Sequence, residues 1–119
     1  MTIQECYDQL HGDLKDACSR LLNETMVTKF VLKFPSDPSM EQLREAVKAK
    51  DIEVSFRAVH TLKGVAANLS FTQLFHSAVD LTEQLRPRQE QADPELLEAL
   101  EEEYKRTLDI LAEFAESNA

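Results

Sequence analysis

The chain has 119 residues, enough for one ordinary domain, and its 13 basic and 22 acidic residues give a formal net charge of −9. This charge argues against nucleic acid or an anionic membrane as the main partner, because both require a basic surface. Two glycines are too few for the turns of a many-stranded sandwich or barrel, whereas 43% hydrophobic content is enough for a folded core.

Apolar residues recur at three- and four-residue steps from the start of the chain, which is the spacing of amphipathic helices. The first helical stretch is expected over residues 3–22 and can break at Gly12, and a second is expected over about 24–34. Thr2 and Glu5 have the spacing of a capping box, in which two side chains satisfy free amides at a helix start.

Four more amphipathic segments follow. They are expected over residues 38–49, 52–69 and 71–86, and from Pro94 to about residue 117. Asp37-Pro38 and Asp93-Pro94 each combine a capping side chain with a proline that suits the first helical turn. Ser70 and Gln73 have the spacing of a second capping box, at the start of the third of these segments.

No stretch of useful length alternates apolar and polar residues as a half-buried strand would. Short connections between long amphipathic helices favour antiparallel neighbours. We therefore predict an all-α fold for a single domain over residues 1–119. It is an antiparallel four-helix bundle over about 38–117, with additional short N-terminal helices over about 2–34 packed on one end or side.

The chain has no apolar run that approaches the roughly 18–20 residues of a membrane span, and its start lacks the pattern of a signal peptide. Cys6 and Cys18 are the only cysteines, and neither has a second cysteine or a histidine at metal-ligand spacing. We therefore expect a cytoplasmic protein with reduced thiols, no disulfide and no metal site.

Chemistry-bearing residues gather in one segment, residues 60–69, within the helix expected over 52–69. A helical wheel puts one stripe beside the buried face. This stripe collects His60, Lys63, Gly64 and Ala67, with Arg57 one turn before them. The imidazole is thus expected at the border of the core, beside small residues and cations.

Gly64 is an unusual choice, because a glycine inside a helix costs about 1 kcal/mol relative to alanine. Two interpretations remain open at this residue. The glycine can clear space beside His60 for the close approach of a partner, or it can allow two helices to pack tightly.

His60 or Lys63 alone would be an ordinary surface residue, but together they make chemical sense. A neutral imidazole is a nucleophile near pH 7. A phosphoryl group on it brings negative charge, which an ammonium group one turn away offsets.

The motif His60-x-Leu62-Lys63-Gly64-x-Ala66-x-x-Leu69 resembles the phosphoacceptor helix of histidine-containing phosphotransfer (HPt) domains, the intermediate carriers of multistep phosphorelays. Helix order and length also fit, so the resemblance covers nearly the whole chain. It implies that His60 is phosphorylated, that Lys63 stabilises phosphoryl charge and that Gly64 gives steric access.

The resemblance also implies supporting residues around the imidazole. Family members often have a polar residue on the return helix that hydrogen-bonds the histidine, and Thr82 matches it best by spacing, with Gln84 as the fallback. Arg57 and Arg86 would add positive potential, although Arg86 also fits an ordinary cation at a helix end. Ala67 belongs to the expected docking stripe.

The sequence departs from the family pattern after Leu69, where a glycine is common and Ser70 stands instead. A glycine there would serve a left-handed turn at the helix end. Serine instead suits a cap for the following helix, so we expect a slightly different corner.

The resemblance implies a phosphorelay intermediate that accepts a phosphoryl group from a receiver-domain aspartate and passes it to another. The partners would be response-regulator receiver domains and a hybrid sensor histidine kinase, with Mg²⁺ on the receiver and no cofactor on this chain. No Gly-rich phosphate loop is present, so autonomous kinase activity is not expected. A complete bundle in one chain favours a monomer, and Met1 with a capped first helix favours a stand-alone carrier.

Two alternatives remain open. A phosphoacceptor and dimerisation module of a histidine kinase usually has an acidic residue after its histidine and a nearby Thr-Pro, whereas Thr61 follows His60 here. A non-catalytic helical interaction module is the other.

A di-iron bundle is disfavoured, because Gln73 precedes His76 where a carboxylate ligand is required. His76 and His11 are expected to be ordinary surface or boundary residues.

Overall fold

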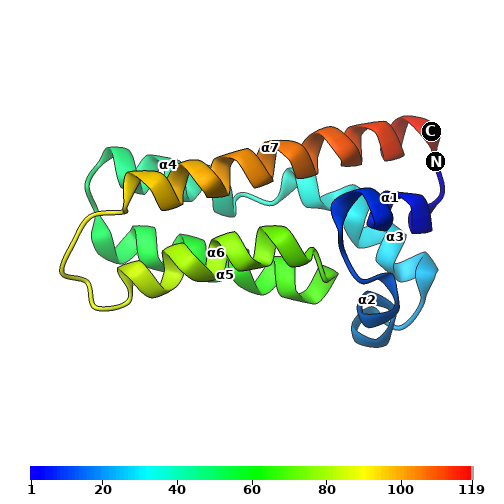
Figure 1. The fold of residues 1–119 in the computed structure, drawn as a ribbon, viewed down its shortest axis with the longest axis horizontal. Helices are drawn as coiled ribbons and strands as arrows, with labels where there is room; N and C mark the ends of the chain where they lie inside the picture. The colour runs from blue at the N-terminus through cyan, green and yellow to red at the C-terminus, as the bar shows by residue number, and fades with distance from the viewer. Residues whose placement is uncertain (119) are drawn as a thin grey trace.

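The computed structural model describes residues 1–118, which form seven α-helices and a short 3₁₀ turn with no strand among them (Figure 1). The elements are α1 (Ile3–Leu10), α2 (Leu14–Leu21), α3 (Glu24–Lys33), η1 (Phe34–Ser36), α4 (Ser39–Lys48), α5 (Ile52–Leu69), α6 (Thr72–Leu85) and α7 (Pro94–Ser117). The all-α prediction is confirmed, and the expected break at Gly12 separates α1 from α2. No helix in the described range is long and apolar enough to cross a membrane.

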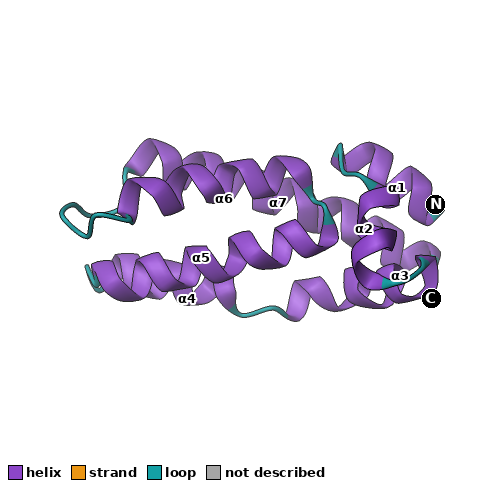
Figure 2. Ribbon diagram, turned by 90° about the horizontal axis from the view of Figure 1, so that it is seen from below, coloured by secondary structure: helices purple, strands orange, loops and turns teal. Residues whose placement is uncertain are grey.

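Helices α4 to α7 form an antiparallel bundle, with α5 packed between α4 and α6 (Figures 1 and 2). Arg44 ties α4 to α7: its guanidinium donates to Glu101 at 2.9 Å and 2.6 Å and lies 5.4 Å from the centre of the Tyr104 ring. The largest fully buried side chains come from every part of the bundle and from the N-terminal helices. They include Tyr7, Val27, Met40, Leu43, Leu62, Phe71, Leu74, Leu81, Leu85, Leu100, Leu111 and Phe114.

The three N-terminal helices lie at one end of the bundle, where α1 and α3 flank the C-terminal half of α7 (Figure 1). An aromatic cluster joins the two parts. The Phe71 ring centre is 5.7 Å from that of Tyr7 and 5.4 Å from that of Phe34, and Phe34 also contacts Tyr104 at 5.9 Å. Tilted and edge-on pairs at such distances add about 0.5–1.5 kcal/mol each beyond their buried area.

Local capping signals set several helix ends as predicted. Thr2 and Glu5 form the reciprocal capping box of α1. The Asp93 carboxylate accepts from two backbone amides at the start of α7, whose first residue is Pro94. Asp37 accepts from the Ser39 amide at 2.9 Å, so it caps α4 although Pro38 is the residue next to the helix.

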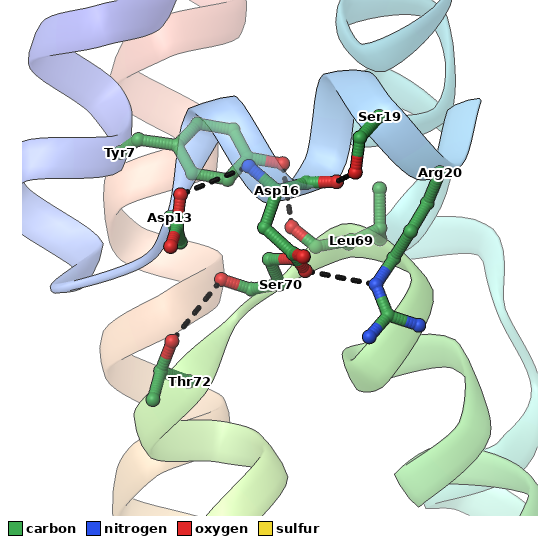
Figure 3. Close-up of polar contacts among 8 residues, drawn as sticks. All are labelled: Tyr7, Asp13, Asp16, Ser19, Arg20, Leu69, Ser70 and Thr72. Atoms are coloured by element: carbon green, nitrogen blue, oxygen red, sulfur yellow. Dashed lines mark hydrogen bonds and ion pairs between the residues drawn. The ribbon is translucent and has the colours of Figure 1, made fainter. Parts of the chain in front are cut away.

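The corner between α5 and α6 differs from the prediction (Figure 3). Ser70 ends α5 in the left-handed conformation, with φ 53° and ψ 40°, and Phe71 precedes α6 without a side-chain cap. The expected capping box of Ser70 and Gln73 is therefore wrong. The Ser70 hydroxyl instead donates to the Asp16 carboxylate, and the Gln73 amide oxygen accepts from Arg106 at 3.0 Å. Ser70 thus adopts the turn that a glycine would serve, while its side chain binds α2.

The N-terminal segment also satisfies backbone groups that the end of α5 leaves free. The Tyr7 hydroxyl donates to the Leu69 carbonyl at 2.7 Å, and the Asp13 amide donates to the Ser70 carbonyl at 3.1 Å. The Ser70 hydroxyl and the Arg20 guanidinium bind the Asp16 carboxylate and hold its pKa below the usual value. These bonds replace intrahelical partners at the helix end and fix the exit angle of α5.

Gly12 lies in the connection between α1 and α2, next to the corner between α5 and α6. A Cβ atom there would come within 2.7 Å of the Ser70 carbonyl oxygen and 2.9 Å of the Tyr7 ring. We expect Gly12→Ala to lower the free energy of unfolding by about 1–3 kcal/mol, the usual range for overpacking. Urea denaturation followed by circular dichroism checks this. An unchanged midpoint would contradict a rigid contact here.

Candidate functional site

Helix α5 buries one stripe and exposes the next. Val59, Leu62 and Ala66 point into the core, and each is at most 1% exposed. His60 and Gly64 are exposed on the adjacent stripe, whereas Lys63 and Ala67 are half-buried along it. The helical spacing predicted from the sequence therefore brings these four residues together on one surface.

The His60 ring stacks on Phe56, one turn earlier on α5. The ring centres are 5.7 Å apart and the planes are inclined by 11°. Phe56 is only 7% exposed, so a nearly buried ring supports one face of an exposed imidazole. This contact favours one orientation of an imidazole that remains exposed to solvent.

Neither residue predicted to hydrogen-bond the imidazole does so. Thr82 is fully buried, and its hydroxyl donates to the Ala78 carbonyl of its own helix at 2.6 Å. Gln84 donates to the Gln91 carbonyl at 3.0 Å and accepts from the Asp93 amide at 2.9 Å. Both side chains bind backbone groups, so Thr82 supports α6 and Gln84 holds the connection between α6 and α7. The prediction that Thr82 or Gln84 hydrogen-bonds the imidazole is therefore wrong in this structure.

Gly64 faces open space. A Cβ atom built at this residue would meet no heavy atom within 4 Å beyond its own helix and chain neighbours. The packing interpretation is therefore wrong, because no neighbouring helix needs the missing side chain. What the glycine provides is an unobstructed surface one turn from His60.

Three arginines lie around the site. Arg57 is exposed, and its Nε is 3.5 Å from a Glu53 carboxylate oxygen. Arg86 pairs with Glu83 at the end of α6, as expected of a cation at a helix end, but its guanidinium also lies 5.4 Å from the centre of the Phe56 ring. Arg88, in the connection before α7, lies over the same ring at 3.6 Å.

Phe56 and Arg88 were not predicted as site residues. Phe56 precedes His60 by four residues, and such pairs are neighbours on a helix, so the spacing carried a signal that its place in the buried stripe obscured. Arg88 lies in a polar connection with no helical period. Its position depends on how the chain folds back over α5, which no local pattern encodes.

The other histidines are surface residues. His11 is exposed and ends α1 in the left-handed conformation, and His76 is exposed on α6. Across residues 1–118, no group of three His, Cys, Asp or Glu side chains is placed to hold a metal ion. Cys6 is buried and Cys18 is half-buried, both as free thiols, and burial raises the pKa of Cys6 to about 11.

His60 is therefore a candidate phosphoacceptor. It is exposed on a helix of a four-helix bundle, Gly64 leaves open surface one turn further along, and cations lie nearby. Comparison with protein-family models matches residues 26–110 to the Hpt domain. The match spans most of the chain, including all of α4, α5 and α6, and the chain therefore belongs to the Hpt domain family. Domains of this family carry out histidine phosphotransfer in two-component systems, with receiver domains and histidine kinases as partners. No curated protein and no solved structure matches the chain.

The open surroundings of Gly64 predict the effect of adding a methyl group. We expect Gly64→Ala to raise the free energy of unfolding by about 1 kcal/mol, because alanine is the better helix former and nothing clashes. Urea denaturation checks this. Gly12→Ala is the matched control, because the same substitution is expected there to lower the free energy of unfolding. A destabilised Gly64→Ala would mean that the glycine serves the fold.

Proposed function

We propose that this protein is a phosphorelay intermediate. His60 accepts a phosphoryl group from the aspartyl phosphate of one receiver domain and passes it to the aspartate of another. The observation that carries this proposal is the exposed His60 imidazole beside the open surface at Gly64, in a chain of the Hpt family.

The chemistry is a direct exchange of the phosphoryl group. The lone pair of the unprotonated ring nitrogen forms the N–P bond while the P–O bond to the receiver aspartate breaks, and the aspartate leaves as a carboxylate. The proton on the other ring nitrogen remains there or exchanges with water. In the second transfer a receiver carboxylate oxygen forms the new P–O bond, and the N–P electron pair returns to the imidazole.

Positioning and electrostatics supply the catalysis in such a reaction. The stack on Phe56 orients the imidazole, and Lys63 lies one helical turn away with a cation to offset phosphoryl charge. Arg57 and Arg86 are further cations near the site, each paired with a glutamate of its own helix in the free protein. Mg²⁺ and the acidic pocket belong to the receiver, and this chain needs no cofactor of its own. A hybrid sensor histidine kinase supplies the phosphate upstream.

The docking surface extends from the stripe of His60, Gly64 and Ala67 toward the N-terminal helices. Val65 and Asn68 of α5 line an open groove of about 460 Å³ with residues of α2, α3 and η1. Phe30 is 39% exposed at this groove, and Leu32 of the same helix is 42% exposed. An apolar centre with polar neighbours is the usual composition of a protein–protein interface.

His60→Gln is expected to abolish phosphate acceptance without unfolding the chain, because the exposed ring contributes little to the core. Incubation with a phosphorylated receiver domain and an assay for acid-labile label checks this. His76→Gln, which alters another exposed histidine, is the matched control and should label normally. Acid-labile label on His60→Gln would assign the phosphoacceptor to another residue.

Gly64→Gln is expected to slow transfer from a phosphorylated receiver by about tenfold or more, because a long side chain displaces the partner from its reacting position. Rapid-quench kinetics measure the rate. Ala112→Gln, on an exposed position of α7, is the control for adding the same side chain elsewhere. Equal rates for wild type and Gly64→Gln would remove the role of the glycine in access.

A further inference from the structure

The Phe56 ring is a shared contact between the imidazole and a loop arginine. His60 stacks on it at 5.7 Å, and the Arg88 guanidinium lies 3.6 Å from its centre. The separation of guanidinium and imidazole therefore cannot exceed the sum of these two distances. That sum is just below the Debye length of about 10 Å in 0.1 M salt, so salt weakens the interaction of the two groups without abolishing it.

Arg88 is held in this place by contacts that a phosphoryl group could replace. Its Nε donates to a Glu53 carboxylate oxygen at 2.9 Å, and its Nη1 donates to the Arg86 carbonyl at 2.8 Å. The other Glu53 oxygen is 3.5 Å from Arg57 Nε. One carboxylate thus neutralises two arginines on the side of α5 that carries His60.

The Arg88 side chain is partly accessible from solvent. It is 38% exposed, in the connection between α6 and α7. The pair with Glu53 is an exposed one, and such pairs contribute about 0–1 kcal/mol, so exchanging this one partner for a phosphoryl group costs little. A phosphoryl group carries about −1.5 to −2 charge at neutral pH and attracts a guanidinium more strongly than a single carboxylate does.

We propose that Arg88 is a phosphoryl-binding residue for phosphohistidine: the Phe56 ring holds its guanidinium near His60, Glu53 neutralises it in the free protein, and it turns to the phosphoryl group after transfer. This inference rests on the proposed function, since it requires a phosphoryl group on His60. It assigns a role to the α6–α7 connection, and it makes Glu53 an opposing charge that the phosphoryl group displaces.

The test measures the lifetime of phosphohistidine on the full chain, labelled with the small phosphoryl donor phosphoramidate and followed by ³¹P NMR. In 50 mM salt, Arg88→Gln should shorten the half-life about threefold to tenfold, since the loss is that of one nearby charge. Glu53→Gln should lengthen it, because this change releases Arg88 and Arg57. In 1 M salt both differences should shrink, because screening leaves a Debye length of about 3 Å.

Matched variants separate this role from a structural one. Arg44→Gln removes an arginine with the same kind of contacts, a glutamate and an aromatic ring, and should leave the half-life unchanged. Arg88→Lys keeps the charge and should restore most of the lifetime, which also covers the case in which Arg88→Gln folds poorly. Circular dichroism verifies the fold of each variant.

The outcomes distinguish the two proposals. Wild-type chain that takes no label from phosphoramidate or from a phosphorylated receiver would count against the proposed function. Labelled His60 with the same half-life in wild type and Arg88→Gln, or a change that 1 M salt does not reduce, would overturn the role of Arg88. A shorter half-life in Glu53→Gln would overturn the opposing role of the carboxylate.

Discussion

The structure depends on one helix that must bury one face and leave the adjacent face exposed. Helix α5 meets both demands through its period: Val59 and Leu62 enter the core, while His60 and Gly64 remain on the surface. Packing between α4 and α6 fixes the rotation of α5 about its axis. A small rotation would bury the imidazole or expose the core, so the flanking helices set the exposure of His60.

The end of α5 is held from outside the bundle. Tyr7 and Asp13 bind carbonyl groups at that end, and Asp16 binds the Ser70 side chain. The family match begins at residue 26, so these three contacts come from residues of the α1–α2 segment that precedes it. The first two helices therefore complete a helix terminus that the bundle alone leaves with free carbonyl groups.

Local signals predicted the parts of the fold that local physics determines. The predicted caps at Thr2 and Asp93 are confirmed, because a capping side chain bonds a backbone amide only two or three residues away and needs no tertiary partner. Ser70 and Thr82 were misassigned because a tertiary partner and a backbone carbonyl compete for their hydroxyl groups. At the site, His60 and Gly64 follow from spacing on one helix. Arg88 does not, because its contact with Phe56 joins segments that only the folded chain brings together.

At Gly64, the residue that would make the fold more stable differs from the residue that leaves the surface beside His60 open. Most proteins lie just above the stability that they need, so a gain of about 1 kcal/mol is easily selected when folding alone is rewarded. A library sorted for thermal resistance would therefore enrich alanine at residue 64, because its methyl group meets no internal obstacle. Under the proposed function, the approach of a receiver domain is what keeps this residue small, so tolerance at residue 64 would report on transfer and not on the bundle.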